Sequence, residues 1–146
     1  MPCDFDTSPG FLIDRNAHLL RLFIKQTLAD LDLDLTAEEV AILIALETRE
    51  VRRIGDLASL LLRDATTVTR QIEGLERKGC AERRPSETDR RVVEVFVTKK
   101  GHACFEKLDP VLDAKREIIL AGISEPDLKT LTRCLQTIRE NVLALS

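Results

Sequence analysis

Residues 57–79 read LASLLLRDATTVTRQIEGLERKG, and residues 80–101 continue CAERRPSETDRRVVEVFVTKKG. The first stretch has the spacing of two short helices joined by a tight turn, and Asp64 is a residue type that caps the start of a helix. In the second stretch Val93, Val95 and Val97 alternate with other residues, which is the two-residue period of a strand. We therefore predict a helix-turn-helix followed by a β-hairpin with an arginine-bearing tip. This combination is suited to laying a helix in a DNA groove with the hairpin alongside.

The charge distribution supports this interpretation, although the whole chain carries a net charge of −3. Residues 49–101 contain 13 Lys and Arg against 9 Asp and Glu, a local net charge of +4, whereas the rest of the chain has 9 against 16, a net charge of −7. The field near a surface depends on local charge, so a basic middle segment is an electrostatic footprint for nucleic acid. On charge alone, a merely mixed surface stays open as the alternative.

Composition narrows the function classes. The 146 residues include five Phe and no Trp or Tyr, so base stacking on single-stranded nucleic acid has few side chains to use. No signal peptide or membrane span is predicted, so we expect a cytoplasmic protein with reduced thiols and no membrane partner. We expect no metal site and no cofactor, because no CxxC pair or histidine cluster occurs among Cys3, Cys80, Cys104, Cys134, His18 and His102.

Helical periodicity is predicted before the central segment. Residues 1–10 read as an irregular arm, and the apolar stripe from Phe11 to Leu31 predicts a long first helix. Thr36 and Glu39 fit a capping box that starts a second helix. Residues 49–53 then form a charged break before a short helix over residues 54–61.

The elements after this break follow from local signals. The helix capped by Asp64 presents Val68, Ile72 and Leu75 inward and ends at Gly79. Strands are predicted over Cys80–Arg84 and Val92–Thr98, with Pro85–Arg91 as the connecting loop. Thr98 can cap a helix over Gly101–Ile123, in which Pro110 should cause a kink or an interruption. Ser124 starts a last helix whose apolar residues alternate at steps of three and four, namely Leu128, Leu131, Leu135, Ile138, Val142 and Leu145. This stripe packs either on the protein's own core or on another subunit.

The order of these elements resembles the MarR family of winged helix-turn-helix transcriptional regulators. The residues that carry the resemblance are LAxxL, TTVTRQIxxLExKG, the DRR at the hairpin tip and VTKKG, and the resemblance spans residues 11–145. It implies a mostly α fold with a small β-hairpin wing, in a single domain over residues 1–146. Within that domain, residues 36–101 would form the DNA-binding lobe, and residues 11–35 and 102–146 the dimerisation helices. The family often has Ser or Thr as a helix cap where Arg53 stands, so Asp56 would have to stabilise that helix start through the dipole.

What the resemblance implies for function is a homodimer that reads a pseudo-palindromic operator in double-stranded DNA, usually as a repressor. The paired stripes on the first and last helices fit this expectation, and we expect dimer contacts from Ile13, Leu20, Leu131, Leu135, Ile138 and Val142. Many relatives also respond to a small phenolic or aromatic effector in a crevice beside these helices. The candidate lining residues are His18, Arg21 and Phe105, although nothing in the sequence names a ligand.

Base reading is expected from the helix that begins at Asp64. Thr can donate to or accept from base edges, and Arg can bind guanine through two hydrogen bonds. The predicted reading set is Thr66, Thr67, Thr69, Arg70 and Gln71. Surface threonines that merely cap and solvate a helix are the alternative.

The hairpin tip is expected to enter the minor groove. The resemblance places Asp89 and Arg91 at the family's Asp-x-Arg tip, with Arg91 inserted, Asp89 orienting it and Arg90 near phosphate. A solvated turn with a local salt bridge is the alternative. Further phosphate contacts are predicted at Arg63, Arg77, Lys78 and Arg84, whereas Arg83 could instead be tied into the fold.

Two alternative functions stay open, and an enzyme is not expected. A winged-helix dimer could bind protein rather than DNA, although such a module would not require Arg70 or the DRR tip. A thiol-based sensor is the other variant, but Cys3 lies upstream of the position of the sensing thiol in such relatives, and Cys80, Cys104 and Cys134 read as small core residues. No acid pairs with a His, Cys or Ser in a catalytic constellation, and no Gly-rich phosphate loop occurs.

Overall fold

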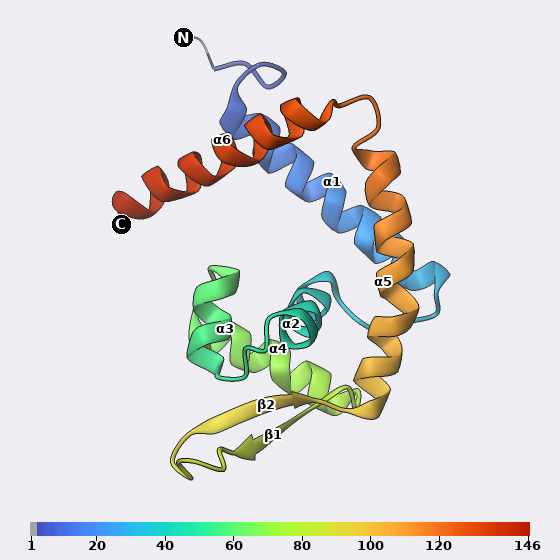
Figure 1. The fold of residues 1–146 in the computed structure, drawn as a ribbon, viewed down its shortest axis with the longest axis vertical. Coiled ribbons are helices and arrows are strands. Elements are labelled where there is room, and N and C mark those ends of the chain that lie inside the picture. Colours follow the sequence, from blue (N-terminus) through green and yellow to red (C-terminus); the bar gives the residue numbers. More distant parts are fainter. Residues whose placement is uncertain (1–2) are drawn as a thin grey trace. The chain divides into compact units, whose positions relative to one another are not determined.

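Two antiparallel strands and six helices make up the part of the chain, residues 3–146, that the computed structural model describes (Figure 1). This is the mostly α fold with a small hairpin that the sequence predicts. The chain forms two compact units that divide between Asp109 and Pro110. None of the described helices has the length and apolarity that a membrane span requires. The elements are α1 (Pro9–Asp30), α2 (Ala37–Thr48), α3 (Ile54–Leu61), α4 (Ala65–Arg77), β1 (Ala81–Pro85), β2 (Val93–Val97), α5 (Lys99–Ile119) and α6 (Glu125–Ala144).

The predicted helix starts are confirmed by their caps. The Glu39 amide donates to Thr36 Oγ1 while the Thr36 amide donates to Glu39 Oε2, both at 3.1 Å, which completes the capping box of α2. Asp64 accepts from the Thr67 amide at 2.8 Å and starts α4. In α3 the Arg53 side chain makes no cap hydrogen bond, and Asp56 lies in the first turn, as predicted.

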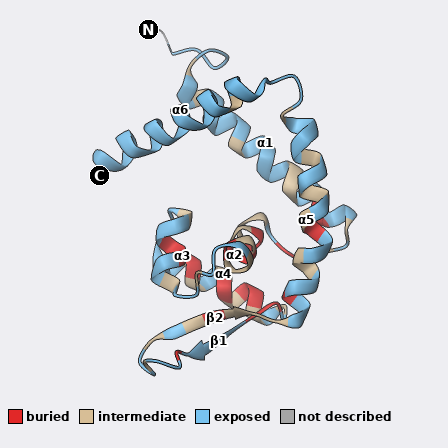
Figure 2. Ribbon diagram, viewed as in Figure 1, coloured by how far each residue is buried: buried red, intermediate tan, exposed pale blue. Residues whose placement is uncertain are grey.

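The core of the first unit is aliphatic and centred on α4 (Figure 2). Val68, Ile72 and Leu75 are fully buried, so the predicted inward face of α4 is confirmed. This helix contacts α2, α3 and β1, which makes it the central element of the lobe. Each fully buried side chain of this size stabilises the fold by about 1.5–3 kcal/mol. Other fully buried side chains of this unit are Ile42, Leu43, Leu57 and Val95.

The hairpin differs from prediction at its edges. β1 pairs with β2 from Ala81↔Val97 to Pro85↔Val93, so both strands start one residue later than expected and Pro85 belongs to a strand. Cys80 stays outside because its amide donates to the Leu75 carbonyl at 2.8 Å and so completes the end of α4. Gly79 precedes it with a φ of +75°, the left-handed conformation that a helix C-terminus favours.

The long helices also show differences at their ends. α1 begins at Pro9 rather than Phe11, because a proline suits the first turn of a helix. In α5 the predicted cap is confirmed, since the Gly101 amide donates to Thr98 Oγ1 at 3.1 Å. The sequence predicts a kink or an interruption at Pro110, and α5 continues through this residue without an interruption. The helix ends at Ile119 rather than Ile123. The start of α6 at Ser124 is confirmed, with the Asp127 amide donating to Ser124 Oγ at 3.2 Å.

Candidate nucleic-acid interface

The first turn of α4 is held by Asp64, and this capping also engages the threonines. Thr67 donates to the Asp64 carboxylate from its amide and from its hydroxyl, each at 2.8 Å, and these bonds lower the pKa of Asp64. The Thr69 hydroxyl donates to the Ala65 carbonyl at 2.8 Å. Thr66 is exposed at the start of the helix. Thr67 and Thr69 therefore keep only their methyl groups and acceptor lone pairs for a ligand, whereas Thr66 keeps its hydroxyl proton as well.

Arg70 and Gln71 differ in their surroundings. Arg70 is exposed, and no ion pair within residues 3–146 occupies its guanidinium. Gln71 Oε1 instead accepts from Arg63 Nη1 at 2.8 Å, and the same Arg63 nitrogen donates to the Glu38 carbonyl at 3.1 Å. Arg63 thus ties the start of α2 to α4, a structural role that differs from the phosphate contact expected of it.

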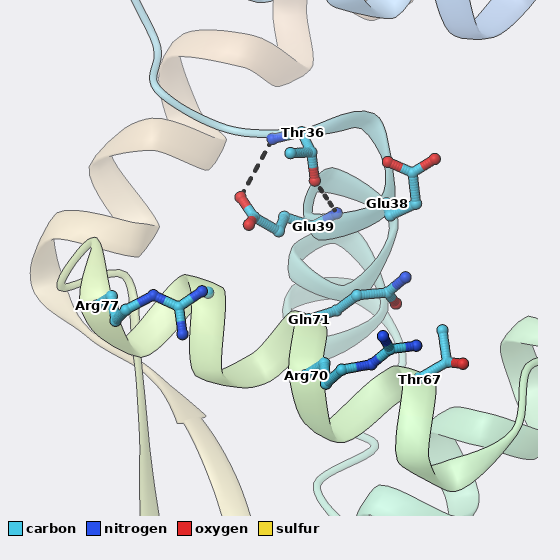
Figure 3. Close-up of a pocket in the computed structure, with 8 residues that line it drawn as sticks. Thr36, Glu38, Glu39, Thr67, Arg70, Gln71 and Arg77 are labelled. Carbon is cyan, nitrogen blue, oxygen red and sulfur yellow. Dashed lines mark hydrogen bonds between the residues drawn. The ribbon is translucent and has the colours of Figure 1, made fainter.

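A hollow of about 360 Å³ lies between α4 and the start of α2 (Figure 3). Thr67, Arg70, Gln71 and Arg77 line it from α4, opposite the capping box of α2. Two guanidinium groups, those of Arg70 and Arg77, lie on the exposed side of α4 and are suited to an extended anionic ligand. Three further residues, Glu38, Glu39 and Gly74, complete the lining.

The predicted phosphate contacts at the end of α4 separate into two kinds. Lys78 Nζ lies 2.7 Å from Glu39 Oε2, and this carboxylate is 8% exposed. Because the partner is buried, the Lys78 ammonium acts inside the lobe rather than as a free surface charge. Arg77 is exposed and has no ion pair within the described chain. Arg83 is tied into the fold rather than left free for phosphate, because its Nε lies 2.8 Å from Glu76 Oε1.

The loop between the strands is an ordered wing with one extended arginine. Arg91 donates from Nε and Nη2 to the two Asp89 oxygens at 3.1 and 3.2 Å, while its side chain is 91% exposed. These hydrogen bonds lower the pKa of Asp89. The base of the loop is closed by the buried Ser86, whose amide donates to the Val92 carbonyl at 2.7 Å. Arg91 is therefore aimed by Asp89, and the neighbouring Arg90 is exposed.

Comparison with known proteins accounts for this arrangement. The model of the MarR family matches residues 35–93, which include α2, α3, α4, β1 and the wing loop. Over these residues the chain is similar to proteins of the MarR family. An uncharacterized HTH-type transcriptional regulator of Bacillus subtilis, YybA, is 27% identical over 111 residues, which cover 76% of this chain and 74% of YybA.

Solved structures confirm the MarR fold over nearly the whole chain. MepR of S. aureus, in a complex with DNA, is 19% identical with a TM-score of 0.82, over 95% of this chain and 99% of MepR. CouR of Rhodococcus jostii, bound to p-coumaroyl-CoA, is 20% identical with a TM-score of 0.80, over 94% of this chain and 95% of CouR. This likeness shows that the chain shares the fold of these two proteins.

The helices that the MarR resemblance assigns to dimer contacts expose apolar side chains. α6 has no buried residue, and the exposed fractions along its stripe are 44% at Leu131, 42% at Leu135, 37% at Ile138 and 57% at Val142. On α1, Ile13 and Leu20 are 38% and 47% exposed. A row of exposed apolar side chains along one helix is typical of an interaction surface.

The expected effector residues of the MarR resemblance are not joined by any contact. His18 and Arg21 are exposed on α1, Phe105 is half-buried on α5, and within residues 3–146 no hydrogen bond, ion pair or ring contact links the three. His102, which the sequence left without a role, is paired instead. Its Nδ1 lies 2.8 Å from Glu47 of α2 and its Nε2 lies 3.0 Å from Glu106, and these carboxylates raise its pKa.

The cysteines are all unpaired thiols with different exposure. Cys80 is buried, and this burial together with the neighbouring Cys104 thiol raises the pKa of Cys80. The interpretation as core residues holds for Cys80 but is wrong for Cys134, which is exposed on α6, and Cys104 is intermediate. Cys3 is exposed. Among the described residues, no cluster of His, Cys, Asp and Glu is suited to a metal ion.

Proposed function

We propose that this chain is a MarR-family regulator that binds a pseudo-palindromic operator in double-stranded DNA as a homodimer and represses nearby genes. The observation that carries the proposal is the combination of the unpaired Arg70 on α4 with the Asp89-aimed Arg91 on the wing. A helix in the major groove and an arginine in the adjacent minor groove read two different features of one site. The basic charge of residues 49–101 supplies the attraction to the phosphates.

The residues of the interface take different roles in this proposal. Thr66 and Arg70 have free polar groups for base edges, whereas Thr67 and Thr69 offer methyl groups and lone pairs. Gln71 is bound to Arg63, so it contributes to reading only if that bond is exchanged for one to a base. Arg91 enters the minor groove. Arg77, Arg84 and Arg90 contact phosphates.

The exposed stripe of α6 supports the homodimer. Covering the apolar side chains of α6 and α1 with the same faces of a second copy would remove them from water, at about 25 cal/mol per Å² of apolar surface. A two-fold dimer would then present two copies of α4 to half-sites about 34 Å apart, one turn of DNA. Such spacing requires a pseudo-palindromic operator.

A gel shift with the DNA that flanks its own gene tests the proposal. We expect a shift at low salt from a folded dimer, and Arg91→Ala should weaken binding and flatten its salt dependence, since each phosphate neutralised adds about 0.9 to the slope of log K against log salt. No shift from a folded dimer at low salt would favour the protein-interaction module instead. Unchanged affinity of Arg91→Ala at low and moderate salt would refute the role of Arg91.

We also propose that a small aromatic or phenolic molecule modulates binding, because CouR, a relative of the same fold, is bound to p-coumaroyl-CoA. His18, Arg21 and Phe105 are the candidate contacts on this chain. Titration of the protein–DNA complex with a panel of aromatic carboxylates tests this. Release of DNA by one of them, lost in Arg21→Ala, is expected, and a panel without effect on a specific complex would contradict it.

A further inference from the structure

Residues 52–53, which the sequence predicts as part of a charged break, pair with the wing as a third strand-like segment. The Val95 amide donates to the Arg52 carbonyl at 2.8 Å, and Arg53 forms an antiparallel bridge with Glu94. β2 is therefore paired on both edges, with β1 on one side and residues 52–53 on the other. Since partners across antiparallel strands point to the same face, Arg53, Glu94 and Arg84 share one face of this small sheet.

Two arginines, Arg84 and Arg52, converge on the ring of Phe96. The guanidinium carbon of Arg84 lies 3.8 Å from the centroid of Phe96, and that of Arg52 lies 4.6 Å from it. Stacking of this kind holds the guanidinium planes in place while their N–H edges stay free for a ligand. Arg52, Arg53 and Arg84 line a hollow of about 420 Å³ together with Phe96, Ser86, Glu87, Thr88 and Glu94.

The acidic residues near these arginines bind only some of the guanidinium N–H donors. Arg84 Nε lies 3.1 Å from Glu82, and Glu94 stands in register between Arg53 and Arg84. Neither Arg52 nor Arg53 has an ion pair within residues 3–146, and both are exposed. A guanidinium carries five N–H donors, so two free arginines and one half-occupied arginine leave a surplus of donors.

This face is continuous with the wing tip. The positive charge of Arg53 contributes to the lowered pKa of Asp89, after the larger effect of the hydrogen bonds from Arg91. The free guanidinium of Arg53 therefore lies within electrostatic reach of the pair that aims Arg91. A duplex whose minor groove receives Arg91 would pass its backbone along the same side of the wing.

We propose that Arg52, Arg53 and Arg84, here called the wing arginine cluster, bind backbone phosphates of the DNA next to the groove that Arg91 enters. The proposal rests on the DNA-binding function proposed above, which already assigns Arg84 to phosphate, and it adds Arg52 and Arg53 as phosphate contacts. Phosphates are the chosen ligand because planar guanidiniums match their oxygens through paired hydrogen bonds.

The test is the double variant Arg52→Gln/Arg53→Gln, measured by fluorescence anisotropy on operator and scrambled duplexes over a range of salt. The slope of log K against log salt should fall by about 1.8, which is 0.9 for each lost phosphate contact. Affinity for both duplexes should fall by the same factor, because phosphate contacts carry no base preference. Arg52→Lys keeps the charge and should retain the slope of the unaltered protein.

The matched control is Arg49→Gln, which removes an exposed arginine three residues from Arg52 but outside the cluster, and it should leave the slope unchanged. Folding should survive in the double variant, because the Arg52 bond to Val95 uses the backbone carbonyl and Arg53 makes no side-chain cap. An unchanged slope in a folded double variant would overturn the inference alone. A loss confined to the operator would also overturn it, and failure of the unaltered folded dimer to bind any duplex would overturn it together with the proposed function.

Discussion

Lys78→Met decides between the phosphate contact that the sequence suggests for Lys78 and the ion pair in which the structure places it. Lys78 Nζ lies 2.7 Å from Glu39 Oε2, the Glu39 side chain is 8% exposed, and that of Lys78 is 24% exposed. Removing one partner of a fully buried pair costs about 3–5 kcal/mol, and the partial exposure of Lys78 reduces this to about 2 kcal/mol. For a chain of this size such a loss lowers the midpoint of thermal unfolding, Tm, by about 6 °C.

The assay combines thermal unfolding with the salt dependence of operator binding. Lys78→Met should lower Tm and leave the slope of log K against log salt unchanged, because no phosphate contact is lost. Arg77→Met, one residue away but exposed and without an ion pair in the described chain, should do the reverse and flatten the slope by about 0.9. In a Lys78→Met/Glu39→Gln double variant the amide oxygen can still accept from the Thr36 amide, so the double loss should be smaller than the sum of the single losses. An unchanged Tm with a flatter slope in Lys78→Met would refute the reasoning.

Three further predictions concern packing, pH and assembly. Gly101→Ala should lower Tm strongly, since an added Cβ would stand 2.1 Å from the Cys80 carbonyl oxygen, and calorimetry measures the loss. His102→Gln should destabilise the protein below about pH 6.5 and much less in mildly alkaline solution. Glu47 raises the pKa of His102 in the folded protein, so the stabilisation by the charged histidine is complete at low pH and is lost as the pH rises through the folded pKa. The Tm of the variant and of the unaltered protein, measured across pH, tests this. Leu135→Asp should convert the proposed dimer to monomers in sedimentation, because it places a charge on the apolar stripe of α6.

Matched controls make these outcomes interpretable. Gly55→Ala should be almost neutral, because nothing lies within 4 Å of its added Cβ. His18→Gln should show no comparable pH dependence, since His18 has no ion pair within residues 3–146. Lys129→Asp changes charge on the exposed surface of α6 outside the stripe and should leave the proposed dimer intact. Equal effects in a variant and its control would contradict the corresponding prediction.

Local signals in the sequence predicted the elements well because their causes are local. Thr36, Asp64 and Ser124 each bond a backbone amide three residues on, a contact that sequence spacing alone specifies. The inward face of α4 follows from its helical period. Asp89 was expected to orient Arg91, and the bonds between them are present. For Arg83 the sequence left a phosphate contact and a tie into the fold open, and the structure pairs it with Glu76.

Contacts between distant segments could not be read in this way. The pairing of residues 52–53 with β2 joins positions more than 40 apart in the sequence, and a run of charged residues carries no strand signal. Three other contacts also depend on the fold rather than on local sequence. They are the pair of Lys78 with Glu39, the pair of His102 with Glu47 and the close approach of Gly101 to the Cys80 carbonyl. A basic residue in the sequence therefore indicates the charge of the lobe, whereas only its partners in the fold indicate whether that charge is free for DNA.

The measurement that tests the central claim most directly is the affinity of the unaltered protein and of Arg70→Ala for operator and scrambled duplexes at one fixed salt concentration. The operator is the sequence protected by the unaltered protein within the DNA that flanks its gene. Loss of two hydrogen bonds to a guanine costs about 1–3 kcal/mol, so the ratio of operator to scrambled affinity should fall by about 5- to 150-fold in Arg70→Ala. A ratio that stays the same in the folded variant would contradict the claim that α4 reads the operator through Arg70.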